Sequence, residues 1–379
     1  MSTNPSPTRI HKDHGYVDEE MQQACLRVLL SRDYYMGLET DQFETELASA
    51  VKARHAATVN SGSSAMFLIL RALGIGPGDE IIVPAMGFVT VAEAVANVGA
   101  RARFVDVEST SYNLDPSKLE DAVTPAVKAV IPTHNYGHPA NMDAIVAFAQ
   151  RHGLSVVEDC AHALGAQYRG RAAGTLGTAG FTSFAGKGIS VCGLGGAVLT
   201  NDDRVASEVR LLRDHGRPRS KGVRSYEIQR VGYNMRLSEL HAAIGRVQIR
   251  RLNEWIRLRQ ENAAYYTERF RRTGLPVVCP DSHDDVEHAF LHYTIRVDAS
   301  KRDGLQRFLA TRGIESSVLY PVELFLLPPY RDAGGYQRGD FPVSEQLTRE
   351  ILSIPNHPSL TEETRKTIVA AMQEFFQTR

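Results

Sequence analysis

Short apolar runs rich in β-branched residues alternate with longer amphipathic segments over the first two hundred residues. This alternation is typical of βαβ units and predicts a mainly parallel sheet covered by helices. The strands are expected at Ala56–Val59, Glu80–Val83, Arg101–Val105, Val127–Ile131, Leu154–Glu158, Thr178–Ser183 and Gly196–Thr200. The helices between them are expected at Ser64–Leu73, Val89–Val98, Pro116–Ala122 and Met142–His152.

The pattern changes after residue 235. Residues 238–272 carry apolar positions at helical spacing and no proline, which predicts one long helix or a kinked pair that bridges two domains. Beyond them, strands are expected at His292–Val297 and Glu315–Leu319, and helices at Arg302–Thr311 and Thr361–Gln377.

The expected fold class is therefore α/β, with a mainly parallel seven-stranded sheet between helices and a smaller C-terminal α+β domain. The polar, proline-containing start of the chain predicts a mobile N-terminal tail over residues 1–14. The change of pattern places the large domain at residues 15–250 and the small domain at residues 251–379.

Composition narrows the possible partners. The chain of 379 residues has 43 Lys and Arg against 44 Asp and Glu, which gives no reason to expect nucleic acid or an anionic membrane. No apolar run reaches the ~20 residues that span a bilayer, and the first twelve residues lack the apolar stretch of a signal peptide, so a cytoplasmic location is expected. The four cysteines show no CxxC spacing, which predicts reduced thiols and no metal site.

Lys187 lies in the segment Gly186-Lys-Gly188, within a loop of small residues between the last two expected strands of the large domain. A bulky cofactor can approach such a backbone closely. A solvated lysine on a glycine-rich hairpin is the competing interpretation of this segment taken alone. Residues upstream decide between the two.

Three other strand ends carry candidate cofactor contacts. Asp159 ends a strand at the carboxyl edge of the sheet, where ligands of open α/β sheets bind, and can hold a pyridine nitrogen protonated or cap a helix. The turn Asn60–Ala65 opens a helix with serines and a glycine, which suits a phosphate, although such turns also occur for conformational reasons alone. Phe88 can cover a cofactor ring or belong to the core.

In their order and register, these segments resemble the fold-type I pyridoxal-phosphate enzymes, and within them the DegT/StrS family of sugar aminotransferases. The resemblance extends from about Gly15 to the C-terminal helix. The segments that carry it are NSGSSA, VPAMGFVTVAEAV, HNYGHPANMDAI, VVEDCAHALGAQYRGRAAGTLG, FTSFAGKGISVCGLGGAVLTND, RLLRDHG and VGYNMRLSELHAAIGRVQ.

The resemblance implies a catalytic lysine, Lys187, that forms an imine with pyridoxal 5'-phosphate and shuttles protons. Its cofactor-binding residues correspond to Gly62, Ser63, Phe88, Asp159, His162, Thr182, Ser183 and Asn234. Among these, Thr182 and Ser183 are alternatives for one phosphate-binding hydroxyl. Asn234 is expected to reach the phosphate of the neighbouring subunit, which implies a homodimer with shared active sites. Its substrate contacts correspond to Tyr35, His215, Tyr320 and Phe325.

The implied reaction takes an amino group from glutamate or glutamine, with pyridoxamine 5'-phosphate as the intermediate form of the cofactor. The acceptor is a keto-sugar, nucleotide-linked or free, or a keto-cyclitol. The basic segment Arg210–Arg230 can bind the diphosphate of a nucleotide sugar or form a solvated loop, and the residues leave both open.

Two departures from the family pattern keep other functions open. Leu194 replaces an acidic residue that usually precedes the paired glycines, and Phe325 stands where a substrate-contacting histidine is common. The alternatives are a sugar dehydratase or epimerase on the same fold and a non-catalytic regulatory relative. Lys187 argues against a dehydratase, because dehydratases of the family tend to carry histidine there.

Overall fold

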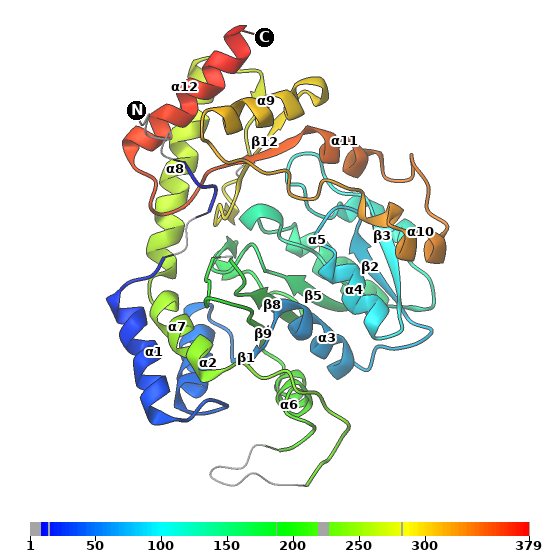
Figure 1. Cartoon of the computed structure of the whole chain (residues 1–379). Helices are drawn as coiled ribbons and strands as arrows, with labels where there is room; N and C mark the ends of the chain where they lie inside the picture. Colours follow the sequence, from blue (N-terminus) through cyan, green and yellow to red (C-terminus); the bar gives the residue numbers. More distant parts are fainter. Residues whose placement is uncertain (1–8, 14–15, 187, 219–226, 282, 379) are drawn as a thin grey trace.

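A seven-stranded sheet forms the centre of the larger part of the molecule (Figure 1). The computed structural model describes residues 9–13, 16–186, 188–218, 227–281 and 283–378. The sheet order is β1-β9-β8-β5-β4-β2-β3, and within these residues only β9 runs antiparallel to its neighbours. The strands are β1 (His55–Val59), β2 (Glu80–Pro84), β3 (Arg101–Val105), β4 (Val127–Val130), β5 (Ser155–Asp159), β8 (Ala179–Ser183) and β9 (Gly196–Thr200). The prediction of a mainly parallel seven-stranded sheet is confirmed.

Helices cover both faces of this sheet because successive side chains of a strand point to opposite sides. On β2, Ile81 and Val83 join the apolar cluster under one set of helices, whereas Ile82 joins the cluster on the other face. The first face carries α3 (Gly62–Ala72), α4 (Thr90–Asn97) and α6 (Asp203–Leu212). The second carries α1 (Glu19–Ser31), α2 (Leu38–Ala50), α5 (Met142–His152) and α7 (Glu239–Ile249).

The predicted bridge between the two parts is a kinked pair of helices. Between α7 and α8 (Leu252–Arg272), the regular helix is interrupted at residues 250 and 251. Leu252 at the start of α8 packs with the large part, and Phe270 near its end packs with the small part. One helix therefore belongs to both apolar cores and ties them together (Figure 1).

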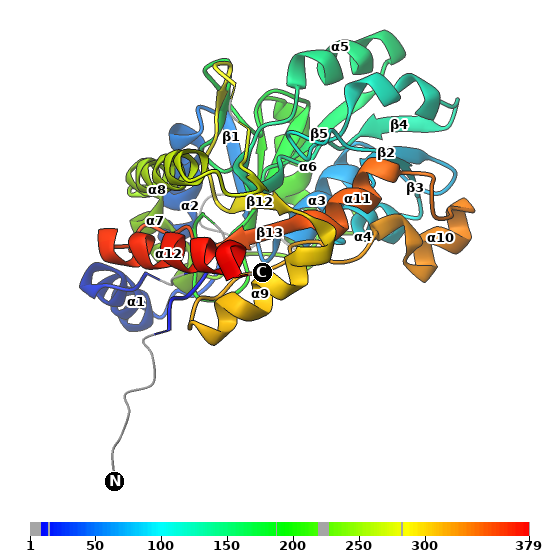
Figure 2. The ribbon, with the colours of Figure 1, turned by 90° about the horizontal axis from the view of Figure 1, so that it is seen from above.

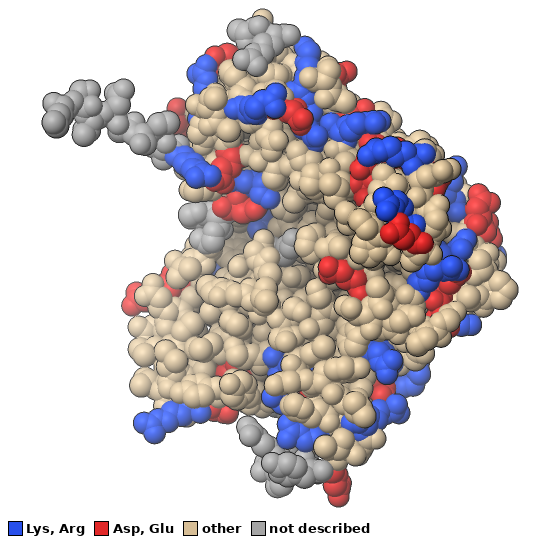
Figure 3. All heavy atoms as spheres, turned by 45° about the vertical axis from the view of Figure 1, so that its right-hand side comes forward, with Lys and Arg blue, Asp and Glu red and all other residues tan. Residues whose placement is uncertain are grey.

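The smaller part is an antiparallel sheet of β10 (Val277–Val278), β12 (Tyr293–Val297) and β13 (Ile351–Ile354), packed against α8, α9 (Ala299–Thr311) and α12 (Glu362–Thr378). Figure 2 shows α9 and α12 beside this sheet. The surface is hollowed between the two parts (Figure 3). The remaining elements are β6 (Gln167–Tyr168), β7 (Arg171–Ala172), β11 (Val286–Glu287), α10 (Pro328–Gly334) and α11 (Pro342–Glu350).

Two predicted elements are wrong. Residues 116–122 form two short 3₁₀ helices, Pro116–Lys118 and Glu120–Ala122, in place of one α-helix. The predicted strand Glu315–Leu319 makes only one bridge, in which Ser317 and Ser353 exchange backbone hydrogen bonds of 3.0 and 2.8 Å. Tyr320, with φ of 69°, and the following proline turn the chain away from the sheet.

Part of the predicted N-terminal tail lies against the small part. Ile10 forms a parallel bridge with Ile314, and its N–H donates to the carbonyl oxygen of Gly313 at 2.8 Å. The N–H of Lys12 donates to Glu315 at 3.0 Å. The contacts of the chain with the fold thus begin before the expected boundary at residue 15, and the division into domains remains a prediction. None of the described helices is long and apolar enough to cross a membrane.

Candidate active site

A cavity of about 270 Å³ lies where several strands of the large sheet end. Because β5 and β8 are parallel neighbours, their last residues, Asp159 and Ser183, meet at the same edge. The segments that follow β1, β2 and β4 bring Gly62, Phe88 and Thr133 to this edge. We call this space the strand-end cavity. Its lining residues are Ser61, Gly62, Ser63, Phe88, Thr90, Thr133, Asp159, Ala161, His162, Phe181, Ser183, Ala185, Leu194, Gly195 and Tyr320.

One wall of the strand-end cavity is the start of α3. Ser61 caps this helix, and its hydroxyl accepts a hydrogen bond from the N–H of Ser64 at 3.0 Å. The first N–H groups of a helix have no partner within the helix and carry its positive dipole end, which together favour an anion. A Cβ at Gly62 would lie 2.9 Å from the Cβ of Ser183, so only glycine lets the two segments approach. This wall can hold a phosphate.

Asp159 supplies a negative charge on another wall of the cavity. This residue is only 4% exposed. Its Oδ1 accepts a hydrogen bond from the N–H of Ala161 at 3.0 Å, which fixes the carboxylate at the end of β5. A buried carboxylate is stabilised by a cationic or N–H donor group beside it. The cavity therefore offers an anion site and a negative charge at two different walls, as a ligand with a phosphate and a protonated ring nitrogen requires.

His162 is held by two tyrosines. The Tyr320 hydroxyl and the Tyr136 backbone N–H each lie 3.4 Å from His162 Nδ1. The ring planes of Tyr136 and Tyr320 make angles of 24° and 17° with the imidazole, and His292 meets it edge-on at a centroid distance of 5.0 Å. Because both nearby groups donate to Nδ1, the assigned tautomer of the neutral ring carries its proton on Nε2.

The mouth of the cavity is apolar. Phe88 is 54% exposed and Leu194 is 65% exposed, although both line the cavity. Deeper inside, the buried hydroxyl of Thr133 has no hydrogen-bond partner among the described residues. A flat ligand under Phe88 that offers a polar atom to Thr133 would satisfy this hydroxyl. The walls thus fit a phosphorylated aromatic cofactor.

Comparison with known proteins identifies the family. The sequence profile of the DegT/DnrJ/EryC1/StrS aminotransferase family matches residues 16–373. The chain belongs to this family. The dTDP-3-amino-3,4,6-trideoxy-alpha-D-glucose transaminase of Streptomyces venezuelae is 40% identical over 360 residues, which cover 94% of this chain and 92% of that protein. A "Pleiotropic regulatory protein" of Geobacillus stearothermophilus is 40% identical over 370 residues, 97% of each chain.

Solved structures agree with this assignment. The crystal structure of S. venezuelae DesV in complex with a ketimine intermediate matches with a TM-score of 0.88 and 38% sequence identity, covering 94% of both chains. The fold class expected from the sequence, a fold-type I α/β transferase, is therefore confirmed, as is the membership of an aminotransferase family.

The structure separates the two hydroxyls that the family resemblance left open. Successive residues of β8 point to opposite faces, so Ser183 lines the strand-end cavity while the Thr182 side chain is fully buried on the other side. The Thr182 hydroxyl has no hydrogen-bond partner in the described part of the chain. Ser183 is therefore the candidate for the phosphate contact, and the choice of Thr182 is wrong in this structure.

Phe325 does not reach the strand-end cavity. Its side chain is 0% exposed and packs against Phe104, Tyr336 and Phe341 in an aromatic cluster, with a centroid distance of 4.6 Å to Phe341. A phenylalanine that fills the core offers no surface to a substrate. The expected substrate contact at Phe325 is thus corrected to a packing role, whereas Tyr320 lines the cavity.

Three other predicted residues lie in or beside isolated backbone bridges. Asn234 pairs with Asp214, and the N–H of His215 donates to the carbonyl oxygen of Tyr233 at 2.9 Å. Tyr35 forms an isolated bridge with Ser238 and is exposed. None of Tyr35, His215 and Asn234 lines the strand-end cavity of this chain. Lys187 lies outside the described residues, between the described Gly186 and Gly188.

The arginines of the segment 210–230 that the structure describes bind groups of their own chain. Arg213 is fully buried and donates to Glu44 at 2.5 Å and to the carbonyl oxygen of Thr58 at 2.6 Å. Arg217 pairs with Asp214 at 2.8 Å. Arg210 donates to the carbonyl oxygen of Ala56, and Arg230 lies 3.2 Å from Glu208. Residues 219–226 lie outside the described part, so the diphosphate interpretation now rests on them.

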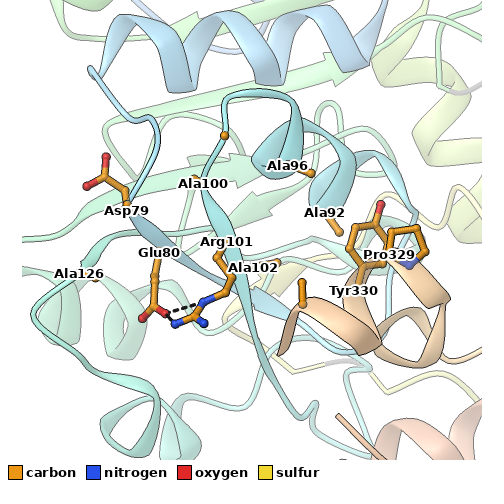
Figure 4. A pocket seen from close by; sticks show the side chains of 13 residues that line it. Asp79, Glu80, Ala92, Ala96, Ala100, Arg101, Ala102, Ala126, Pro329 and Tyr330 are labelled. Carbon is orange, nitrogen blue, oxygen red and sulfur yellow. Dashed lines mark hydrogen bonds and ion pairs between the residues drawn. The ribbon is translucent and has the colours of Figure 1, made fainter. Parts of the chain in front are cut away.

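A second space, which we call the edge hollow, lies at the outer side of the sheet (Figure 4). It measures about 350 Å³ between α4, β3 and α10. Its wall is mostly alanine and glycine, with Tyr330 and Pro329 on one side. Its charged side chains Arg101 and Glu80 bind each other, because Arg101 Nε donates to Glu80 at 2.8 Å. The edge hollow is larger than the strand-end cavity but offers fewer unengaged polar groups.

Three residues of the site were not assigned from the sequence. Thr90 bonds to Ser63, with 3.2 Å between the hydroxyl oxygens, and Thr133 turns its hydroxyl into the cavity wall. Tyr136 supports His162. Thr90 starts α4, and Thr133 and Tyr136 lie in the segment that follows β4, so their place after the strand ends is the signal that could have drawn attention to them.

Proposed function

We propose that this chain is a pyridoxal-phosphate-dependent aminotransferase that moves an amino group from glutamate or glutamine to a keto-sugar. The observation that carries the proposal is the strand-end cavity, where a helix N-terminus and a buried carboxylate lie on different walls beside the segment of Lys187. Few other small molecules need an anion site, an acidic partner and a neighbouring amine together.

In this proposal, each wall has one task. The amides of Gly62 and Ser63 and the hydroxyl of Ser183 bind the phosphate, and Asp159 holds the proton on the ring nitrogen. When bound, the cofactor supplies an electron sink for the negative charge that develops on the substrate carbon. Lys187 would hold the cofactor covalently through Nζ. Once the amino group of the donor has displaced it, the freed amine would take the proton from the donor's α-carbon. Proton transfer by a positioned base typically contributes about 10²–10⁴-fold to the rate.

The acceptor in this proposal is a nucleotide-linked keto-sugar. Support comes from the S. venezuelae relative, whose name is that of a dTDP-amino-sugar transaminase. Within the basic segment, the described arginines are already paired, so Arg219, Lys221 and Arg224 remain as candidate diphosphate contacts. A keto-cyclitol acceptor would leave these three cations without a role in binding.

A homodimer with shared active sites is part of the proposal. Phe88 and Leu194 at the cavity mouth are exposed apolar residues, and a broad area below the hollow in Figure 3 carries few charged atoms. Other exposed apolar residues lie on α1, at the start of α2 and between them: Leu26, Leu29, Leu30, Tyr34, Tyr35 and Leu38. A second copy would bury such a surface and bring its own Asn234 towards the phosphate.

A regulatory role without catalysis is the second candidate, because the G. stearothermophilus relative is named as a regulatory protein. This chain retains the lysine, the buried Asp159 and the glycine of the anion site. A protein that only binds a partner has no need of a carboxylate held at the end of β5. The retained set therefore favours catalysis.

Replacing Lys187 tests the proposal. Lys187→Ala should abolish the visible absorbance of the covalently bound cofactor and reduce amino transfer to background, because no other group takes its place in forming the bond and moving the proton. Absorbance spectra and product analysis by mass spectrometry measure both effects. Lys118→Ala, an exposed lysine on a 3₁₀ turn, is the matched control and should change neither. Full activity of Lys187→Ala would overturn the proposal.

The unmodified protein distinguishes transfer from the other functions. With glutamate or glutamine alone, it should release one equivalent of 2-oxo acid per active site while the cofactor absorbance changes. A sugar dehydratase would release water from its substrate without consuming the donor. A purely regulatory protein would show neither change.

A further inference from the structure

A narrow polar pocket lies next to His162. Tyr136 and His292 line this pocket, and the rings of both also contact the ring of His162. We call it the histidine pocket. Its volume is about 10 Å³. Its lining residues are Thr110, Ser111, Tyr112, Asn135, Tyr136, His138, Pro280, Asp281, His288, His292 and Thr294. None of its lining residues lines the strand-end cavity.

Three buried polar atoms in this pocket have no hydrogen-bond partner among the described residues: Tyr136 Oη, Asn135 Oδ1 and His138 Nε2. The three residues are 2%, 0% and 6% exposed, so bulk solvent does not satisfy them. Leaving one such group unpaired costs about 1–3 kcal/mol, and proteins rarely accept several together. The pocket is therefore built for something that bonds to all three.

The other bonds of these residues define what that ligand must offer. His138 Nδ1 lies 2.7 Å from the carbonyl oxygen of Pro139 and donates to it, which leaves Nε2 as an acceptor. Burial lowers the pKa of His138, so the ring stays neutral. Asn135 Nδ2 donates to the carbonyl oxygen of Tyr112 at 2.7 Å, which leaves Oδ1 as an acceptor. The Tyr136 hydroxyl is then the one donor.

We propose that the histidine pocket holds one ordered water molecule, which fixes Tyr136 and, through it, the orientation of His162. A water molecule donates two hydrogen bonds and accepts one or two, which matches two acceptors and one donor. A cavity of about 10–15 Å³ is the size that one water needs, and buried waters make about three hydrogen bonds. In the described chain, no group of three or more His, Cys, Asp or Glu side chains is arranged to hold a metal.

Tyr136 is the link between this water and the strand-end cavity. Its backbone is left-handed, with φ of 59°, a conformation that costs a non-glycine residue about 1–2 kcal/mol. In that conformation its N–H lies against His162 Nδ1 and its ring stacks on the imidazole. The water bonded to the phenol end offsets part of this cost. Tyr136 is thus a positioning residue, and only the role of His162 towards the cofactor rests on the proposed function.

A high-resolution crystal structure of the full chain without cofactor tests the water directly. We expect one water at about 2.7–3.2 Å from each of Tyr136 Oη, Asn135 Oδ1 and His138 Nε2. An empty pocket, or direct hydrogen bonds among the three side chains, would overturn the proposal. This result does not depend on the cofactor, so it fails or succeeds separately from the proposed aminotransferase activity.

Tyr136→Phe tests the consequence for His162. Losing the phenol bond should loosen the contact to Nδ1 and raise the pKa of His162, because the neutral imidazole loses a donor, as histidine-selective ¹⁵N NMR of the cofactor-free protein measures. Among the residues that the structure describes, the titratable groups that face His162 are Asp159, Tyr136, Tyr320 and His292. They are unchanged in the variant except for the deleted hydroxyl.

Tyr112→Phe is the matched control. Tyr112 also lines the histidine pocket with a positive φ, and its ring meets that of Tyr136 at 5.6 Å, but it makes no contact with His162. It should leave the His162 titration unchanged. An unaltered His162 titration in Tyr136→Phe, or an equal shift in Tyr112→Phe, would overturn the positioning role. Should Tyr136→Phe not fold, His138→Phe removes the Nε2 acceptor and must shift the titration in the same direction.

Discussion

The strand-end cavity and the edge hollow differ in chemistry more than in size. The edge hollow is the larger of the two, at about 350 Å³ against about 270 Å³. Its two carboxylates are already bound, Glu80 by Arg101 and Thr124 and Asp79 by the N–H of Gly76. In the strand-end cavity, by contrast, a helix N-terminus and the unpartnered hydroxyl of Thr133 face the same space as Asp159. Polar groups that face the cavity and can bind a ligand distinguish the functional site, and the volume of the cavity does not.

The sheet topology causes this difference. The segments after five strands reach the strand-end cavity, because parallel strands end at the same edge and their loops diverge there. The edge hollow lies beside β3, the last strand of the sheet, and its walls come from α4, α10, the first residues of β2 and β3, and the turns before β2, β3 and β4. The strand-end cavity thus collects polar side chains from segments that follow strands, whereas the edge hollow lies at the starts of its strands, mostly among alanine and glycine.

The largest expected effect comes from removing the charge of the strand-end cavity. Asp159→Asn should lower kcat by about 10²–10³-fold, because the ring nitrogen loses the carboxylate that keeps it protonated. Steady-state kinetics measures the loss, and the thermal unfolding midpoint reports whether the fold is kept. Asp79→Asn, which makes the same change at the edge hollow, should leave kcat within about twofold of the unmodified protein, a change well under 1 kcal/mol. Equal losses in both variants would remove the distinction between the two spaces.

A smaller effect is expected at the anion wall. In Gly62→Ala, the new Cβ would lie 2.9 Å from that of Ser183, so the start of α3 must shift away from the phosphate. Overpacking of about 1–3 kcal/mol should weaken cofactor binding about tenfold or more, as equilibrium dialysis or absorbance titration measures.

Gly76→Ala is the control for this substitution. Its Cβ would meet nothing closer than the carbonyl oxygen of Val98 at 3.8 Å. The cofactor affinity of this variant should match that of the unmodified protein. An unchanged affinity in Gly62→Ala would show that the α3 wall is not the phosphate site.

The sequence predicts the strands and the strand ends that form the site, because local sequence patterns determine them. β3 and β9 have the predicted bounds, since a turn-forming residue follows each directly, Asp106 after β3 and Asn201 after β9. Asp159 and Gly62 were placed because parallel strands end at one edge, a rule that needs no coordinates. Membership of the aminotransferase family follows from the same motifs.

What the sequence did not predict depends on tertiary packing. The family pattern suggested a substrate contact at Phe325, yet the aromatic cluster around Phe341 buries it. Tyr136 gains its role from a left-handed backbone and from contacts with residues 26 and more positions away. Residues 116–122 show a helical pattern, but the chain turns there twice. None of these outcomes is encoded in residue spacing alone.

The smallest effect is expected at the edge hollow itself. Burial raises the pKa of Glu80, but hydrogen bonds from Thr124 and Arg101 and the charges of Arg103 and Arg101 outweigh it, so the pKa lies below its usual value of 4.5. A lowered pKa stabilises the fold above pH 4.5, and this stabilisation is lost as the pH falls through the folded-state pKa. Glu80→Gln should therefore lower the thermal unfolding midpoint by about 1–2 °C at pH 7, for a loss of about 1 kcal/mol. The difference from the unmodified protein should shrink as the pH falls below 4.5, while kcat at pH 7 stays unchanged. A difference that is independent of pH would show that the paired charges of the edge hollow do not stabilise the fold through ionisation.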